Sequence, residues 1–494
     1  MRLLGLRLSA HDSNVTYYDG EQLRYTNLER DYQIKHFGFD SLYNWTSVLE
    51  KWNIIPSEVD AICIVEDTPN SHGRTEELIE IPIFRDIGFV CPIHRIDHHY
   101  AHTLSFWPLG VKPNLHFVFD GFGDDYIYRS IWRDNKLVDC RKTNSQMCKY
   151  APSLGFIMTR IGALLQMGGH YLDQAGKVMA LKAYGSHCPV VPESFSIDGL
   201  NEIWNFDILE KNINDRWFVM DYIATAHEYT EQVFLNHFLE HVREGDIVGY
   251  SGGIAQNILI NTKLREHIPN LFIPPHANDS GLSLGCIEYL RSTYSLDDFD
   301  ISGFPFWDGE SPKERPSDKT IKDTAESLAY GKIVGWYQGA GEIGPRALGN
   351  RSILMSPFVK GGKDYINEKV KHRESYRPFG ASVLEEKVSE HFDWEGESPY
   401  MLYNSVVKGD VTYEYDSIKH KDRTCRHQTV SEDHEDYYRL IKEFEMLTGL
   451  PILLNTSLNN AGKPIAGRIP DALQLYYESG LDVLVAGNEI WSKS

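Results

Sequence analysis

The chain is poor in cysteine and has no paired-cysteine motif. Its 494 residues include seven cysteines, at Cys63, Cys91, Cys140, Cys148, Cys188, Cys286 and Cys425. No two of them form a C-x-x-C pair, which excludes zinc-finger and thioredoxin-type sites. An odd number without a regular framework is typical of free thiols in a reducing compartment, so we expect a cytoplasmic protein.

Long apolar segments and an excess of cations are also missing. The sequence contains no run of 18 apolar residues, and the apolar stretch within residues 1–14 is too short for a signal peptide. Lys and Arg number 49 against 70 Asp and Glu, which gives a net charge of −21. This charge repels nucleic-acid backbones and anionic lipids, so we expect neither polymeric nucleic acid nor a membrane as a partner.

The remaining composition is typical of a compact globular protein. Of the residues, 42% are hydrophobic, 12% aromatic and 24% charged, and the length allows about two to four domains. Short apolar runs predict strands at residues 3–9, 15–18, 22–25, 60–65, 115–119 and 246–250, with helical patterns between them. Such alternation predicts an α/β fold.

A stretch rich in proline, glycine and charge, at residues 303–318, predicts a domain boundary. We therefore expect one domain at residues 1–310 and a second, smaller domain at residues 319–494. The second has strand-like runs of its own, at residues 332–337, 451–454 and 482–485.

A pair of histidines four residues apart is the first candidate site. On a helix, His98 and His102 would project from one face and could share a metal, whereas His99 would point elsewhere. Pairs at this spacing also occur as surface or capping residues, so the spacing leaves both interpretations open. A metal would need further ligands from other segments.

Two aspartates are suited to supply those ligands. Asp120 follows the apolar run at residues 115–119, where a carboxylate would lie at the edge of a sheet, and Asp279 precedes a run of small residues. Asp279 could instead cap a helix, and Asp124 and Asp125 could be solvated turn residues. Two histidines with two carboxylates would suit a first-row divalent metal with open positions, closer to iron or manganese than to structural zinc.

Two glycine-containing segments predict contacts with a nucleotide. Gly252 and Gly253 follow an apolar strand and precede a helical pattern, whose N-terminal amides could receive a phosphate or ribose. Tight packing of the strand on the helix explains the two glycines nearly as well. Lys177 follows Gly176 and could meet a phosphate, although in isolation an exposed lysine is the more common case.

A group of cations stands out in this acidic chain. Residues 341–383 contain Arg346, Arg351, Lys371, Arg373 and Arg377, interleaved with glycine and proline. Cations on a rigid loop are typical of a polyphosphate pocket, and we favour that interpretation over a solvated charged face.

Residues further along the chain could complete such a pocket. Arg426 adds one more cation, and Asn455, Ser457 and Asn459 follow the strand predicted at residues 451–454. Their side chains suit phosphate or ribose oxygens, or else cap the turn after the strand.

In their order along the chain, the motifs resemble one enzyme family. They are SAHDSN (9–14), ERDYQIKH (29–36), HHYAH (98–102), FDGFGD (119–124), AGKVMALKAYG (175–185), SGGIAQN (251–257), ANDSG (277–281), GPRALGNRSIL (344–354), VKHRESYRPFGASV (370–383) and LLNTSLN (453–459). Together they resemble the O-carbamoyltransferases of the nodulation, cephamycin and tobramycin type.

The resemblance implies an N-terminal actin-like (ASKHA) duplicated domain, similar to the universal tRNA threonylcarbamoyl-transfer protein. It also implies a smaller C-terminal α/β domain, similar to the partner that forms carbamoyl-adenylates. In such enzymes the C-terminal domain makes carbamoyl-adenylate from carbamoyl phosphate and ATP, which binds with Mg²⁺. The N-terminal domain then transfers the carbamoyl group to a hydroxyl of a small molecule, such as a sugar, a natural product or a modified nucleoside.

The resemblance also assigns residues to sites. The metal site, for Fe(II) or a similar divalent ion, falls on His98, His102, Asp120 and Asp279. The contacts with the adenylate fall on Gly252, Gly253 and Asn257, with Lys177 in a neighbouring motif. The pocket for ATP and carbamoyl phosphate falls on Arg346, Lys371, Arg377, Arg426, Asn455 and Ser457.

Transfer to a hydroxyl also needs a group that takes up its proton. His11 or Asp12 is our candidate for this catalytic base, unless the two residues only cap a turn. We expect an enzyme of this size to form a homodimer. Two alternatives stay open: a kinase or ATPase of the actin-like fold that uses Asp120, and a non-catalytic protein that binds metal and nucleotide.

Overall fold

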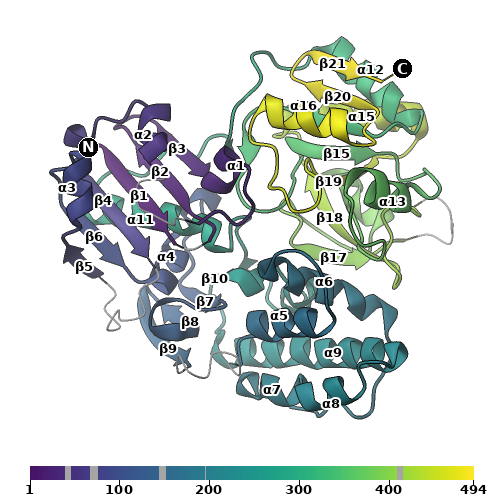
Figure 1. Ribbon diagram of the computed structural model, residues 1–494, viewed down its shortest axis with the longest axis horizontal. Coiled ribbons are helices and arrows are strands. Elements are labelled where there is room, and N and C mark those ends of the chain that lie inside the picture. The colour runs from purple at the N-terminus through teal and green to yellow at the C-terminus, as the bar shows by residue number, and fades with distance from the viewer. Residues whose placement is uncertain are drawn as a thin grey trace.

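Three large β-sheets organise the structure. The computed structural model describes residues 1–9, 11–38, 46–66, 76–143, 152–194, 196–408 and 415–493. A six-stranded, a five-stranded and an eight-stranded sheet each carry helices, which confirms the predicted α/β class (Figure 1). The six cysteines in the described part of the chain are free, and Cys148 lies outside it.

The first sheet has the strand order β3-β2-β1-β4-β6-β5. Its strands are β1 (Leu3–Leu8), β2 (Asn14–Tyr18), β3 (Leu23–Asn27), β4 (Ala61–Glu66), β5 (Glu76–Ile79) and β6 (Ile93–Ile96). Strand β1 is antiparallel to β2 and parallel to β4, which is parallel to β6. Helices α2 (Ser47–Lys51) and α3 (Pro82–Ile87) pack on one face, and α11 (Leu282–Thr293) packs on the other.

The second sheet repeats this arrangement with the order β9-β8-β7-β10-β11. Its strands are β7 (Leu115–Phe119), β8 (Ile127–Arg133), β9 (Lys136–Lys142), β10 (Val248–Ser251) and β11 (Leu271–Phe272). Strand β7 is antiparallel to β8 and parallel to β10, which is parallel to β11. Five strands thus have the same order and directions in both sheets, which confirms the duplicated actin-like fold.

In the part of the chain that forms the first two sheets, most helices lie around the second sheet. They are α4 (His98–Leu104), α5 (Leu154–Leu164), α6 (Gln174–Leu181), α7 (Leu200–Ile203), α8 (Phe206–Lys211), α9 (Arg216–His241) and α10 (Ile258–Arg265). The longest, α9, has 26 residues and begins after Asp215, whose side chain accepts hydrogen bonds from the first turn. Among the helices that the structure describes, none is long and apolar enough to cross a membrane.

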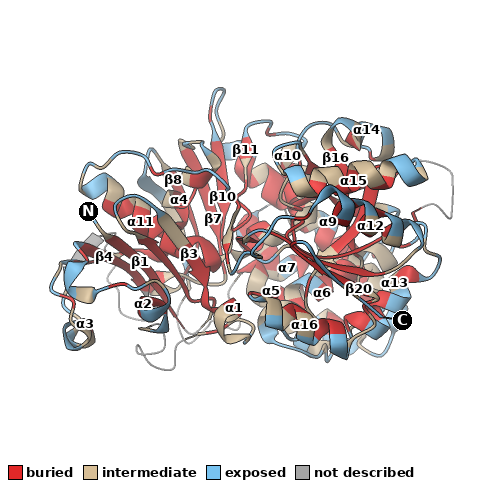
Figure 2. Ribbon diagram, turned by 90° about the horizontal axis from the view of Figure 1, so that it is seen from above, coloured by how far each residue is buried: buried red, intermediate tan, exposed pale blue. Residues whose placement is uncertain are grey.

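Parallel pairing in the second sheet brings polar residues to one edge. All five residues of β7 are buried, as expected for a strand that is covered on both faces. Because β7 and β10 are parallel, the residues that follow them, Asp120 and Gly252, emerge at the same edge. Figure 2 shows these central strands buried and the outer faces of the surrounding helices exposed.

The third sheet has the order β17-β18-β16-β19-β15-β13-β20-β21. Its strands are β13 (Val334–Tyr337), β15 (Arg351–Met355), β16 (Gly380–Leu384), β17 (Tyr403–Val406), β18 (Thr424–Val430), β19 (Ile452–Ser457), β20 (Val483–Ala486) and β21 (Glu489–Ser492). Its helices are α12 (Asp318–Ala329), α13 (Gly362–Tyr365), α14 (Val388–His391), α15 (Glu435–Thr448) and α16 (Ile469–Glu478). The third sheet and its helices form what we call the third unit. The buried residues of its hydrophobic core lie between Ile321 and Ala486 in the chain.

The segment expected to separate the domains is partly structured. Within it, β12 (Phe306–Asp308) pairs with β14 (Gly341–Glu342), which leads into the third sheet. Asp308 is fully buried, with Oδ2 3.3 Å from Nε of Arg30 in α1 (Leu28–Tyr32). Arg30 also donates from Nη2 to the carbonyl of Gly344 at 2.8 Å. These contacts of Arg30 join the first sheet to the third unit.

The substitution Arg30→Met should destabilise the protein, because Asp308 would stay buried without its cation. Removing one partner of a buried ion pair costs about 3–5 kcal/mol. We expect a lower thermal midpoint by circular dichroism, and a partial recovery in the double variant Arg30→Met/Asp308→Asn, which buries no unpaired charge. An unchanged midpoint in the single variant would contradict this role of the ion pair.

Candidate active site

One cavity of about 670 Å³ is lined by residues from all three sheets and their loops. The first sheet and its loops contribute His11, Asp12, Lys35 and His36. The second contributes Asp120, Asp173, Lys177, Gly253, Asn257 and Asp279. The third contributes Arg346, Lys371, Arg373, Arg377, Arg426, Asn455 and Ser457. Most of the site residues expected from the sequence therefore border one space.

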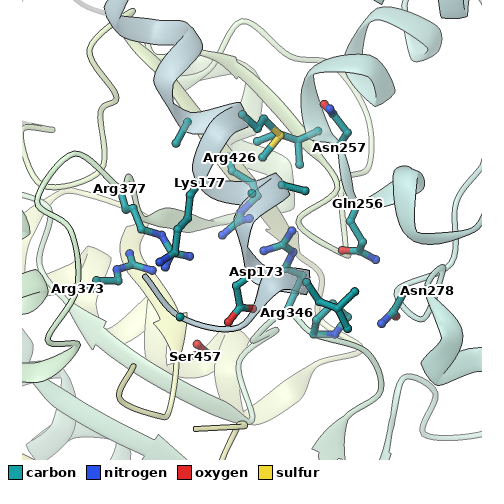
Figure 3. A pocket seen from close by; sticks show the side chains of 18 of the residues that line it. Asp173, Lys177, Gln256, Asn257, Asn278, Arg346, Arg373, Arg377, Arg426 and Ser457 are labelled. Carbon is teal, nitrogen blue, oxygen red and sulfur yellow. The ribbon is translucent and has the colours of Figure 1, made fainter. Parts of the chain in front are cut away.

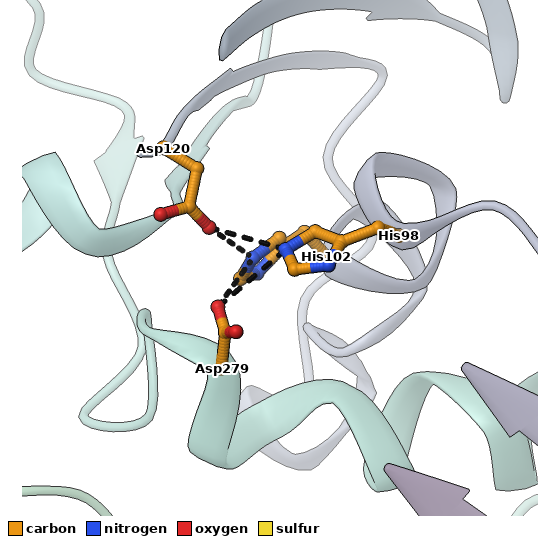
Figure 4. A group of neighbouring side chains, drawn as sticks. All are labelled: His98, His102, Asp120 and Asp279. Atoms are coloured by element: carbon orange, nitrogen blue, oxygen red, sulfur yellow. Dashed lines mark hydrogen bonds and ion pairs between the residues drawn. The ribbon is translucent and has the colours of Figure 1, made fainter. Parts of the chain in front are cut away.

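The candidate metal cluster begins on α4. Asp97 caps this helix by accepting a hydrogen bond from the backbone N–H of Tyr100 at 2.9 Å. The spacing of four residues then brings the rings of His98 and His102 together, with centroids 5.1 Å apart. Nε2 of each ring lies 3.2 Å from Oδ2 of Asp120 (Figure 4).

Asp279 closes the cluster from the other side. Its Oδ1 lies 3.5 Å from Nε2 of His98 and 3.7 Å from Nε2 of His102. Arg7 of β1 donates to its Oδ2 at 2.8 Å. Asp279 is the first residue of a 3₁₀ turn and not its N-cap, so the capping interpretation is wrong. One ligand atom from each of the four residues expected at the metal site lies within 4.8 Å of the others.

The cluster suits a divalent cation. Two imidazole nitrogens face two carboxylate oxygens, a donor set that fits first-row metals. Burial and the nearby Asp279 oppose ionisation of Asp120, yet hydrogen bonds from His102 and His98 hold the pKa of Asp120 below its ordinary value. Burial also opposes ionisation of Asp279, but His98 and Arg7 outweigh it and hold the pKa of Asp279 well below its ordinary value. Both carboxylates are therefore charged at neutral pH.

Two residues beside the cluster do not supply ligand atoms to it. His99 turns away, as expected from its spacing, and its Nδ1 lies 2.7 Å from Oγ of Ser130. Asp124 is buried and accepts a hydrogen bond from the backbone N–H of His98 at 3.0 Å. The interpretation of Asp124 as a solvated turn residue is therefore wrong, because its carboxylate holds the start of α4.

The candidate catalytic base lies next to the cluster. Nδ1 of His11 is 3.1 Å from Oδ2 of Asp12 and 3.8 Å from Oδ2 of Asp279. Asp12 has a left-handed backbone with φ 51°, a conformation that Asp adopts more readily than most residues. A carboxylate at Nδ1 fixes the neutral ring as the tautomer whose Nε2 can accept a proton.

Sequence reasoning missed the residues behind this pair. Nδ1 of His36 lies 3.0 Å from Oδ1 of Asp12, and its Nε2 lies 3.2 Å from Oδ1 of Asp173, which also pairs with Lys35. Burial alone would lower the pKa of His36, but its hydrogen bonds to the two aspartates raise it to about 10. His36 belongs to a motif of the resemblance. Asp173 carries no comparable signal, because it lies 137 residues from His36.

The turn at Gly252 serves the packing of the sheet. Gly252 has φ 92°, and a Cβ there would lie 2.1 Å from the carbonyl oxygen of Phe119, so only glycine fits. Two N-terminal amides of α10, those of Leu259 and Ile260, donate to the side chain of Asn257. A contact of this segment with a nucleotide stays a prediction. The backbone N–H of Gly253 donates to Oδ1 of Asp120 at 3.3 Å.

Lys177 is buried, and the expectation of an exposed side chain is wrong. Its Nζ donates to the carbonyl of Gly168 at 2.6 Å and to the carboxylate of Glu374 at 2.5 Å. Glu374 belongs to the third unit, so this ion pair joins the two halves of the cavity wall. A contact of Lys177 with a phosphate stays a prediction.

Five cations lie on the side of the cavity that the third unit forms, which we call the cation wall. They are Lys371 and the arginines Arg346, Arg373, Arg377 and Arg426, the last four labelled in Figure 3. Burial and neighbouring arginines lower the pKa of Arg346 far below its ordinary value, and burial lowers that of Arg426 to about 10. Within the described ranges, Arg377 pairs with Glu374 at 3.9 Å, whereas Arg346 makes no ion pair. Buried cations without counter-charges favour a bound polyanion.

Lys371 links several polar residues of this wall by hydrogen bonds. Its Nζ donates to the carbonyl and Oγ of Ser457, at 2.7 and 3.1 Å, and to the carbonyl of Asn459 at 2.8 Å. Asn455 is wholly buried, and its Oδ1 has no hydrogen-bond partner among the described residues. Arg351 is not part of this wall, because it lies 3.5 Å over the ring of Tyr337 and donates to backbone carbonyls.

Comparisons with known proteins cover both parts of the cavity wall. Residues 84–287 match the carbamoyltransferase N-terminus, and residues 325–493 match the carbamoyltransferase C-terminus. Nodulation protein NolO of Bradyrhizobium diazoefficiens is 36% identical over 79% of this chain and 78% of that protein. Nodulation protein NolNO of Sinorhizobium fredii is 36% identical over 55% of this chain, but the match spans only 44% of that protein. The 3'-hydroxymethylcephem-O-carbamoyltransferase of Amycolatopsis lactamdurans is 30% identical over 65% of this chain and 66% of that protein.

Protein loaded anaerobically with Fe(II) should retain about one metal ion per chain at the four-residue cluster. His102→Gln should lower the metal content, measured by plasma mass spectrometry after gel filtration, at least tenfold, because it removes a ligand nitrogen. His99→Gln is the matched control on the same helix and should keep the metal. Equal loss in both variants, or in neither, would contradict the assignment.

Pyrophosphate should raise the thermal midpoint, because it would neutralise the cation wall. A ligand at 100 times its Kd stabilises the folded state by about 2.7 kcal/mol. Arg346→Gln should remove most of the shift in a thermal-shift titration, whereas Arg315→Gln, at an exposed ion pair, should leave it unchanged. A shift of the same size in all three proteins would mean that pyrophosphate binds elsewhere.

Proposed function

The chain belongs to the carbamoyltransferase family, and on this premise we propose that it is an ATP-dependent O-carbamoyltransferase working through carbamoyl-adenylate. The observation that carries the proposal is the shared cavity. Its wall combines the cations of the third unit with Asp120 and Asp279 of the metal cluster. A polyphosphate pocket and a transfer site in one space suit a two-step reaction with a common intermediate.

The cation wall suits the first step, the formation of carbamoyl-adenylate from MgATP and carbamoyl phosphate. Water would first hydrolyse carbamoyl phosphate, which releases phosphate and leaves carbamate. A carbamate oxygen then attacks the α-phosphorus of ATP, and pyrophosphate leaves. Arg346, Arg377 and Arg426 would offset the negative charge on the phosphates. The hydrogen bond from Lys371 to Oγ of Ser457 would keep Lys371 in position in the same wall.

The part of the cavity lined by the first and second sheets suits the second step, the transfer of the carbamoyl group. His11, oriented by Asp12, would take the proton of the acceptor hydroxyl as its oxygen attacks the carbamoyl carbon. The bond between that carbon and the adenylate oxygen breaks, and AMP leaves. Fe(II) or a similar divalent ion, held by the four-residue cluster, would polarise the carbamoyl carbonyl when bound.

We assign adenylate formation to residues 319–494 and transfer to residues 1–310. The acceptor in this proposal is a small molecule with a hydroxyl, which includes sugars, natural products and modified nucleosides. One relative bears the name of such an acceptor, a hydroxymethylcephem. A cavity of about 670 Å³ lies within the usual size range of small-molecule sites.

The first half-reaction can be tested without knowing the acceptor. Metal-loaded protein is incubated with ATP, Mg²⁺ and carbamoyl phosphate, and pyrophosphate and carbamoyl-adenylate are measured by mass spectrometry. We expect both products only when carbamoyl phosphate is present. Release of ADP would favour a kinase or ATPase, and the absence of every product would favour a non-catalytic protein.

Two substitutions should separate the half-reactions. Lys371→Ala should lower pyrophosphate release at least 100-fold, because Lys371 links Ser457 and Asn459 in the cation wall. Asp279→Ala should spare pyrophosphate release and abolish AMP release from carbamoyl-adenylate, because it removes a carboxylate of the metal cluster. Lys319→Ala, at an exposed side chain, should change neither. If both active-site variants lose both activities equally, the division of labour is wrong.

A further inference from the structure

A line of charged side chains extends behind the candidate base. From Asp173 it passes through His36 and Asp12 to His11, with successive contacts of 3.2, 3.0 and 3.1 Å. All four residues border the cavity. The side chain of His36 is only 15% exposed and lies in the middle of the line.

Both ring nitrogens of His36 face carboxylate oxygens. An ionised carboxylate only accepts hydrogen bonds, so both nitrogens must carry protons for the two contacts to form. The surrounding groups fit a cation: Glu29 accepts the backbone N–H of His36 at 2.9 Å, and Lys35 pairs with Asp173 and not with the ring. The ring of His170 stacks on His36 with centroids 4.8 Å apart. The raised pKa of His36, about 10, agrees with a ring that stays charged at neutral pH.

The segment that carries His36 is also held by the third unit. Arg30 donates to the carbonyl of Gly344 at 2.8 Å, and the side chain of Gln33 donates to the carbonyl of Ile465 at 3.5 Å. The position of His36 is therefore set relative to the cation wall as well as to Asp12. A group held from several sides is suited to orient a neighbour, because it has little freedom to turn away.

We propose that His36 is a positioning residue for carbamoyl transfer: a fixed cation, anchored by Asp173, that holds Asp12 in the orientation in which it accepts the Nδ1 proton of His11. Nε2 of His11 then stays open to the acceptor hydroxyl. Without His36, the carboxylate of Asp12 can rotate away, and His11 loses its fixed tautomer. The inference rests on the proposed function, since the step that His36 serves is the transfer to a hydroxyl.

Single-turnover kinetics test this role with ATP, carbamoyl phosphate and water as the hydroxyl compound. His36→Gln removes the charge but keeps one donor group. We expect pyrophosphate release within twofold of wild type, an unchanged KM for ATP, and AMP release slowed at least tenfold, so that carbamoyl-adenylate accumulates. Asp173→Asn should act in the same direction, and the double variant should be no slower than His36→Gln. His267→Gln, at an exposed histidine, is the matched control and should behave as wild type.

The role is overturned if His36→Gln leaves the ratio of AMP to pyrophosphate release unchanged, or if the effects of the two substitutions multiply. If wild type makes no pyrophosphate from carbamoyl phosphate, the proposed function fails, and a second measurement still decides on His36. In ¹⁵N NMR spectra of protein labelled on histidine, the signals missing from His36→Gln should belong to a ring with two protonated nitrogens at pH 8. A neutral ring would overturn the proposal.

Discussion

A buried charge needs a partner of opposite sign, and the arrangement of the cavity follows from this constraint. Asp279 meets Arg7, and together with Asp120 it faces the two histidines of α4. The buried pair of Arg30 and Asp308 joins the first sheet to the third unit by the same principle. Arg346, Arg373 and Arg426 are the exception, because none of them forms an ion pair with another described residue, whereas Arg377 has Glu374. In the proposed reaction, the phosphates of the substrate would supply the counter-charge.

Sheet topology decides which charges meet. Because β7 and β10 are parallel, Asp120 and the turn at Gly252 emerge side by side, and the backbone of Gly253 contacts the carboxylate of Asp120. The turn after β1 brings His11 next to the metal cluster, with Nδ1 3.8 Å from Oδ2 of Asp279. The third unit forms the remaining wall of the cavity, and Lys177 donates a hydrogen bond to Glu374 of that unit. The proposed two-step reaction depends on this closure, because neither wall holds all the groups it needs.

Expectations that depend on local spacing agreed with the structure. The i, i+4 pair on α4 brought His98 and His102 together, because a helix repeats its face at that interval. Expectations about exposure failed at Lys177 and Asp124. Each of these side chains has a partner that the neighbouring sequence does not indicate: Lys177 has a carboxylate of the third unit, and Asp124 has the first backbone amide of α4.

The amino-acid sequence by itself determined the α/β class, most strands, the family and the residue types of the site, because these follow from periodicity and from ordered motifs. Only the tertiary structure decided that both groups of motifs border one cavity, that Arg351 stays outside it, and that Asp173 and His36 stand behind His11. These facts depend on contacts between residues far apart in the chain. Such contacts are selected by packing and by the pairing of buried charges over the whole fold, and no local pattern records them.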